Sequence, residues 1–75
     1  MYTIDEKMKQ RLDNDYSYHA PKGDQAARYI EIRDAAKVLA LTIVKNSPVS
    51  REQSVALTLL DQLAMMANAA IARNE

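Results

Sequence analysis

The sequence has no cysteine, tryptophan or phenylalanine, and only one histidine, one glycine and two prolines among its 75 residues. Without cysteine there is no disulfide framework and no thiolate metal site, and one histidine is too few for a histidine-based zinc site. The basic and acidic side chains balance, so the formal net charge is zero. A neutral chain lacks the basic surface of a protein that grips a long nucleic acid. We therefore expect no metal, no other cofactor and no long nucleic acid as a partner.

Long apolar runs are also missing. No uninterrupted apolar stretch approaches the roughly 20 residues that span a bilayer. The first ten residues, MYTIDEKMKQ, carry charges where a signal peptide has its apolar region. A chain this short makes one domain at most, because it buries only about 60% of the surface that its unfolded form exposes. The expectation is a single soluble domain inside the cell, with no membrane partner.

The scarcity of proline and glycine favours an all-α fold. Both prolines and the glycine fall in two short segments, YHAPKGD and NSPVS, which we interpret as connections. The expected elements are a helix at about 4–13, a loop at 14–22, a helix at about 23–46, a turn at 47–50 and a helix at about 51–74. A connection of about four residues forces the two long helices to be antiparallel neighbours. The sequence thus predicts a short N-terminal helix followed by a long antiparallel helical hairpin.

Each long helix carries an apolar seam at spacings of three and four residues, which is typical of two helices that pack together. The seams consist of Tyr29, Ile32, Ala36, Leu39 and Ile43 in the second helix and Ala56, Leu60, Leu63, Ala67 and Ala70 in the third. Between the seams, Pro48 stops the second helix, and Ser50 followed by Gln53 fits the capping box that starts the third.

The long helices also carry more apolar residues than these seams use. The surplus consists of Ile30, Val38, Leu41, Val44, Val55, Leu57, Leu59, Met65, Met66 and Ile71. A helix that is apolar on several sides is normally buried on several sides, whereas a hairpin offers one contact face. The surplus therefore predicts a compact homo-oligomer. The alternative is a monomer covered by the first helix, whose stripe of Ile4, Met8 and Leu12 is narrow for that purpose.

The connection DNDYSYHAPKGDQ contains features suited to an anionic ligand. Gly23 can bring its backbone close to a ligand, Asp24 is a candidate N-cap, and the free N–H groups at the start of a helix favour an anion. Lys22 adds a positive charge at the same place. Ordinary turn chemistry is the alternative explanation of a Lys-Gly pair before a helix.

Tyrosine rings accompany this possible anion site. Tyr16 and Tyr18 alternate along the connection, so that one ring can face a ligand, and a flat ring beside an anion pocket suits a nucleobase attached to a phosphate. Tyrosines in a connection also pack simply as hydrophobic plugs. The single histidine, His19, has no cysteine or serine nucleophile at a recognisable spacing, so we expect no catalytic residue and no enzyme.

Several runs of residues together resemble a known family. The run YHAPKGDQ, then RYxxIRDAAKxLA, SPVSREQSVALTxLDQ and the terminal ANAAIARNE are similar to the phage hairpin-domain family of cyclic-oligonucleotide sponges, which counter CBASS and Thoeris immune signalling. The resemblance covers about residues 14–75. It implies a helical protomer in a compact hexamer that works in the host cell cytoplasm. It also implies non-catalytic binding of cyclic dinucleotides and, in some members, of cyclic trinucleotides or cyclic ADP-ribose isomers.

The resemblance also implies roles for individual residues. Lys22 matches the lysine that contacts phosphate, and Tyr18 with His19 matches the aromatic position that stacks on a base. The match fades before residue 14, so a stacking group from the first helix is the alternative. The candidate ligand-binding residues are Tyr18, His19, Pro21, Lys22, Gly23, Asp24 and Arg73, with Met8 and Arg11 from the first helix and Tyr2 just before it. Arg73, with Asn74, belongs to the matching terminal run and either binds ligand or closes the oligomer.

Two other classes of function remain open from the sequence. The surplus of apolar residues would also suit a helical interaction module that binds the helix or groove of another protein. An enzyme that acts on the cyclic nucleotide is a third class, and it would consume the ligand instead of releasing it unchanged.

Overall fold

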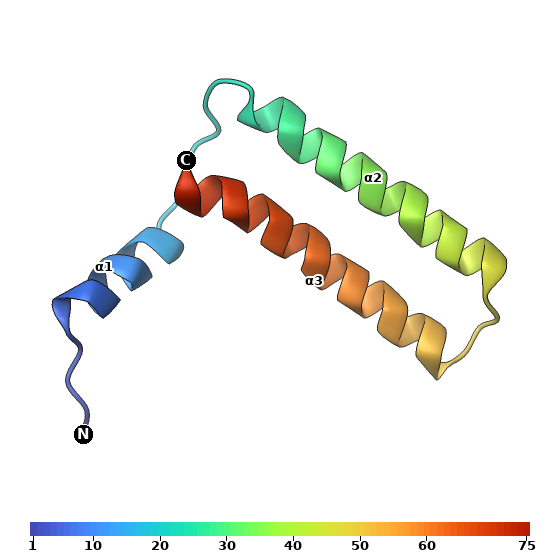
Figure 1. The fold of residues 1–75 in the computed structure, drawn as a ribbon, viewed down its shortest axis with the longest axis horizontal. Coiled ribbons are helices and arrows are strands. Elements are labelled where there is room, and N and C mark those ends of the chain that lie inside the picture. Colours follow the sequence, from blue (N-terminus) through green and yellow to red (C-terminus); the bar gives the residue numbers. More distant parts are fainter.

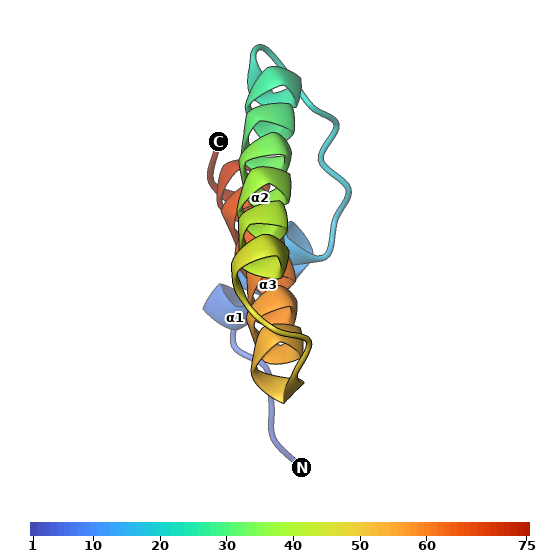
Figure 2. The same ribbon diagram turned by 90° about the vertical axis from the view of Figure 1, so that its right-hand side faces the viewer.

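The computed structural model describes residues 1–75 and is all-α (Figure 1). It contains three helices, α1 (Glu6–Asp15), α2 (Gln25–Asn46) and α3 (Arg51–Asn74). The helices α2 and α3 lie side by side and antiparallel, and α1 projects away from the end of the hairpin where α3 finishes (Figure 1). The molecule is a slab of 48 × 39 × 13 Å, seen along its edge in Figure 2. The predicted short helix followed by a long helical hairpin is confirmed.

The first helix begins two residues later than its apolar stripe suggested. The Asp5 carboxylate accepts a hydrogen bond from the Met8 N–H at 2.7 Å, so Asp5 is the N-cap and Ile4 lies outside the helix. The side chain of Met8 is 41% exposed, because α1 does not lie on the hairpin. The monomer in which the first helix covers the apolar surplus is therefore not the arrangement that forms.

Ser50 and Gln53 stabilise the turn between α2 and α3, as the sequence indicated, but their hydrogen bonds differ from those of a complete capping box. Ser50 Oγ accepts the Gln53 N–H at 3.1 Å, which is one half of a capping box. The other half is absent, because Gln53 Nε2 donates to the Ser47 carbonyl at 3.0 Å and to Ser47 Oγ at 3.1 Å. Gln53 thereby links the end of α2 to the start of α3 across the turn.

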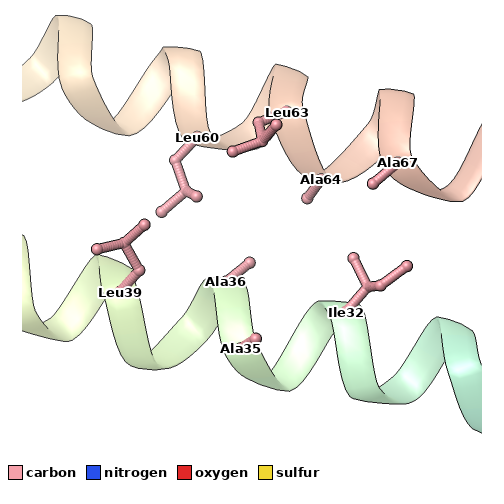
Figure 3. Close-up of a pocket in the computed structure, with 8 residues that line it drawn as sticks. All are labelled: Ile32, Ala35, Ala36, Leu39, Leu60, Leu63, Ala64 and Ala67. Atoms are coloured by element: carbon pink, nitrogen blue, oxygen red, sulfur yellow. The ribbon is translucent and has the colours of Figure 1, made fainter.

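Small and branched apolar side chains line the groove between the two long helices (Figure 3). The groove has a volume of about 290 Å³ and is lined by Ile32, Ala35, Ala36, Leu39, Leu60, Leu63, Ala64 and Ala67. Most of these are predicted seam residues. Tyr29 differs, because it lies beside the connection between α1 and α2 instead.

The hairpin by itself buries almost nothing. Leu60, at 8% exposure, is the only buried hydrophobic residue, and Gln25 is the only buried polar one. Most of the predicted surplus is exposed, most strongly at Val38, Leu59, Met65 and Met66, whereas Leu57 and Ile71 are half-buried. The seam residue Leu63 is exposed as well. Burying one such side chain fully is worth roughly 1.5 to 3 kcal/mol. The folded protomer therefore leaves a large share of its potential apolar stabilisation unused.

The apolar character of α3 is strong enough to raise the question of a membrane. By length and composition alone this helix could cross one. Asp61 interrupts the run, so the expectation of no continuous apolar stretch holds in the strict sense. One helix of this kind is weak evidence for a membrane span, because the core helix of a soluble protein has the same length and composition.

Candidate functional site

The segment between α1 and α2 runs along one side of the hairpin slab (Figure 2). It ends in a tight turn in which the Gln25 N–H donates to the Lys22 carbonyl at 3.1 Å. In return, the Lys22 N–H donates to Gln25 Oε1 at 3.1 Å. Gly23 within this turn has a φ of +57°, the only positive φ in the chain. The turn fixes the backbone of Lys22 at the start of α2, while the ammonium group of Lys22 makes no ion pair.

A cluster of polar side chains closes the open end of the hairpin beside this turn. The Glu75 carboxylate accepts hydrogen bonds from Arg28 Nη1 at 2.8 Å, from Arg28 Nη2, and from Gln25 Nε2 at 3.2 Å. The Arg28 hydrogen bonds, followed by the one from Gln25, lower the pKa of Glu75 to about 2. The same hydrogen bonds raise the pKa of Arg28 above its ordinary value. The start of α2 is thus attached to the end of α3.

Two hollows flank the connection. The Lys22 hollow, of about 260 Å³, is lined by Tyr18, His19, Ala20, Lys22, Gln25, Ala72 and Glu75. The Tyr29 hollow, of about 390 Å³, is lined by Tyr18, His19, Pro21, Tyr29, Arg33, Asn68, Ala69 and Ala72. Tyr18 and His19 take part in both. The two predicted ring residues therefore lie between a hollow that contains a lysine and a hollow that contains an arginine.

The two ring residues are held differently. His19 Nε2 lies 2.7 Å from the Asn14 carbonyl oxygen, which accepts its hydrogen bond and fixes the imidazole against the end of α1. Tyr18 is 87% exposed and its hydroxyl makes no hydrogen bond. Tyr18 is therefore not a hydrophobic plug within the protomer, and its ring is open to a planar ligand. Tyr16 is exposed as well, but it lines neither hollow.

The remaining predicted site residues are dispersed. Asp24 occupies the N-cap position of α2 without a side-chain cap, because its carboxylate lies 3.2 Å from Arg28 Nη2 instead. Arg73 Nε lies 3.6 Å from Asp15 Oδ1, and its carbonyl accepts from Asn14 Nδ2 at 2.9 Å, so that Arg73 joins α1 to α3. Residues Tyr2, Met8 and Arg11 line neither hollow within one protomer. A role for these residues in ligand binding stays a prediction.

Sequence reasoning missed several residues that the fold brings to the connection. They are Gln25, Arg28, Tyr29, Arg33, Asn68, Ala72 and Glu75. One signal was present in the sequence, because Gln25, Tyr29 and Arg33 follow one another at i, i+4 spacing and share one face of α2. Which residues of α3 lie at the connection depends on the register of the hairpin. A predicted turn determines that register only to within a residue or two.

The site offers charge and hydrogen bonding without a metal cluster. No group of three or more histidine, cysteine, aspartate or glutamate side chains lies close enough together to hold a metal ion. What the arrangement provides is an unpaired lysine, an unpaired arginine and an open tyrosine ring, which together can bind an anion attached to a flat ring system.

Comparison with known proteins gives one match. A model of the Acb2/Tad1 hairpin domain matches residues 8–72, which include most of α1, the connection and nearly all of the hairpin. No curated protein and no solved structure matches the chain significantly.

Proposed function

Because the chain belongs to the Acb2/Tad1 hairpin domain family, whose members are phage anti-CBASS and anti-Thoeris cyclic-nucleotide sponges, we propose that it sequesters cyclic oligonucleotide messengers of host immunity. Cyclic dinucleotides are the primary ligands of this proposal, with cyclic trinucleotides or cyclic ADP-ribose isomers as further ones. The protein acts in the host cell cytoplasm, binds the messenger without chemical change, and keeps it from its effector.

The observation that carries the proposal is the family match over residues 8–72, and the loop site supports it. Lys22, free of any ion pair, lines a hollow that Tyr18 and His19 also line. The lysine supplies charge for a phosphate and the exposed tyrosine supplies a face for a base. A sponge needs affinity alone and no complementarity to a transition state, which fits a site without a nucleophile.

A homo-hexamer is part of the proposal. Two apolar helices with one buried hydrophobic residue between them leave Val38, Leu59 and Met66 for contacts between copies. Assembly also multiplies the site, because each copy contributes one Lys22 and one Tyr18, so that local positive charge gathers although each chain is neutral.

Calorimetry with cyclic dinucleotides tests the loop site. Lys22→Ala removes a charge-assisted contact worth roughly 1.5 to 3 kcal/mol, so we expect about a tenfold to hundredfold weaker binding for each contacting copy. Lys45→Ala is the matched control, because Lys45 is exposed in the last turn of α2 at the far end of the hairpin. If the two variants bound the cyclic dinucleotide with equal affinity, Lys22 would not contact the ligand.

Recovery of the ligand separates sequestration from catalysis. The protein is incubated with the bound messenger and then denatured by heat, and the released nucleotide is analysed by chromatography and mass spectrometry. We expect unchanged ligand in full yield. Loss of the ligand, or a linear product, would make the protein an enzyme.

The exposed apolar surface of α2 and α3 also favours a second candidate, a helical interaction module that docks on another protein. Light scattering on the purified chain distinguishes the two, since a sponge of the proposed kind forms a defined oligomer by itself. A module that requires a partner remains monomeric, aggregates or folds poorly when it is alone.

A further inference from the structure

Gln25 is the one polar residue that the protomer buries, at 6% exposure, although it is the first residue of α2 and directly follows a turn. Its carboxamide makes one hydrogen bond as an acceptor and one as a donor. Gln25 Oε1 accepts the Lys22 N–H at 3.1 Å, and Gln25 Nε2 donates to Glu75 Oε1 at 3.2 Å. A single buried side chain therefore joins the backbone of the site lysine to the residue that follows α3.

The chemistry of the two partners determines which way this carboxamide points. The pKa of Glu75 is lowered to about 2, first by its hydrogen bonds from Arg28 and then by the one from Gln25, so its carboxylate is ionised at neutral pH and can only accept. The Lys22 N–H can only donate. A reversed carboxamide would therefore satisfy neither partner. Glu75 holds Gln25 in the orientation in which its oxygen faces the Lys22 N–H.

Few other contacts restrain the Lys22 turn. Apart from the bond to Gln25 Oε1, its backbone is held by the hydrogen bond from the Gln25 N–H to the Lys22 carbonyl, at 3.1 Å. Gly23, which follows, makes no hydrogen bond through its N–H and belongs to the residue type with the most conformational freedom. The Lys22 ammonium makes no ion pair that would hold the side chain from its other end. The position of Lys22 thus depends on Gln25.

From this geometry we propose that Gln25 is a positioning residue of the site, which holds the Lys22 turn in the conformation that binds a phosphate of the cyclic ligand. The inference rests on the proposed function and adds the residue through which α3 acts on the site lysine. Gln25 acts through Lys22, because both polar groups of its carboxamide are already bonded within the protomer. A turn that is ordered before the ligand arrives avoids the loss of affinity that ordering it on binding would bring.

Gln25→Met tests this role, because methionine is similar in length, fills the same buried space and forms neither hydrogen bond. In calorimetry with a cyclic dinucleotide we expect the affinity to fall by roughly twofold to tenfold, the range for one neutral hydrogen bond. Gln53→Met is the matched control, since Gln53 Nε2 bonds across the other turn of the hairpin and the residue lines neither hollow. This control should lower the melting temperature and leave the affinity unchanged.

The same substitution in a Lys22→Ala background separates positioning from other roles. If Gln25 acts only through Lys22, Gln25→Met should cause no further loss of affinity once the lysine side chain is absent. A loss of equal size in both backgrounds would mean that Gln25 contacts the ligand itself or supports the fold in general. That result would overturn the inference.

Amide hydrogen exchange, followed by NMR on the unmodified protein, tests the same contact without a substitution, and it decides the matter if the Gln25→Met chain does not fold. The Lys22 N–H should exchange more slowly than the Gly23 N–H beside it, because only the Lys22 N–H is hydrogen-bonded. Equal exchange rates of the two amides would show that Gln25 does not hold the turn, and would overturn the inference as well.

Failure of this inference is distinguishable from failure of the proposed function. Unchanged affinity of Gln25→Met beside a weakened Lys22→Ala would refute the positioning role and leave the loop site in place. Unchanged affinity of Lys22→Ala would refute the loop site, and the positioning role with it. If the unmodified protein binds no cyclic oligonucleotide at all, the proposed function itself fails.

Discussion

Gly23 is the point at which a small change should disturb the candidate site with a calculable effect. Its φ of +57° lies in the left-handed region, and a Cβ atom built on it would meet nothing within 4 Å. The cost of Gly23→Ala is therefore purely conformational, about 1 to 2 kcal/mol for an L-residue held in this region. That amount changes an equilibrium constant by roughly fivefold to 30-fold.

The structure also indicates where this cost should appear. The turn around Gly23 is joined to Gln25 by two hydrogen bonds of 3.1 Å, and Gln25 in turn contacts Glu75. If the turn keeps its shape, the free energy of unfolding falls by the full amount. If the turn relaxes, Lys22 moves and ligand binding weakens by the same factor, because the native turn must be restored on binding.

Two measurements decide this, urea unfolding followed by circular dichroism at a fixed protein concentration and calorimetry with a cyclic dinucleotide. The losses in the two assays should together amount to about 1 to 2 kcal/mol for Gly23→Ala. Gly23→Asn should cost clearly less, because asparagine visits the left-handed region more readily than alanine. An alanine variant that is unchanged in both assays, or an asparagine variant as impaired as alanine, would refute the reasoning.

Three further predictions concern other parts of the molecule. Tyr18→Phe should bind a cyclic dinucleotide almost normally, whereas Tyr18→Ala should lose roughly 1 to 3 kcal/mol per stacked base in calorimetry without a lower melting temperature, because the exposed ring supports no packing. If Tyr18→Ala bound the cyclic dinucleotide with unchanged affinity, the stacking group would instead be His19 or a residue of the first helix. Leu59→Asp should lower the mass in light scattering or unfold the chain, because the proposed assembly would bury the new charge without a partner. Thr58→Asp, at the neighbouring position, should leave the mass unchanged, and equal masses of the two variants would exclude the Leu59 face from assembly. The pKa of Glu75 is lowered to about 2 from 4.5, so its contribution to stability is complete above pH 4.5 and disappears as the pH falls towards 2. The difference in melting temperature between the unmodified protein and Glu75→Gln should shrink over that range, and a constant difference would contradict the Arg28 contact.

The fold was predictable because its determinants are local. Residue spacings of three and four identify the seams, and Pro48 with Ser50 identifies the turn. The errors are also local in origin. Asp5 competes with Ile4 for the start of α1 and prevails because a carboxylate can accept the Met8 N–H. In a capping box the Gln53 side chain would accept from the Ser50 N–H, whereas here Gln53 Nε2 donates to the Ser47 carbonyl and to Ser47 Oγ.

The candidate site was predictable only in part, because some of its lining residues come from the other end of the chain. Lys22 and Tyr18 are only four positions apart in the sequence and could be recognised together. Glu75 and Asn68 reach the site through the register of the hairpin, and a shift of one residue would rotate each of them about 100° around α3, away from its present neighbours. The register follows from packing over the full length of the two helices, which local patterns do not determine.

The scarcity of buried side chains has a consequence for the response of the protein to dilution. With Leu60 as its only buried hydrophobic residue, a separate protomer has little to offset the backbone entropy of two long helices, which is about 1 to 2 kcal/mol per ordered residue. In the proposed oligomer the helical state depends on contacts that form only when copies meet, and the midpoint of thermal melting should then rise with protein concentration. Below a threshold of expression the chains would be unfolded and open to proteases, so that messenger capture would begin abruptly as the threshold is passed and not in proportion to the number of chains made.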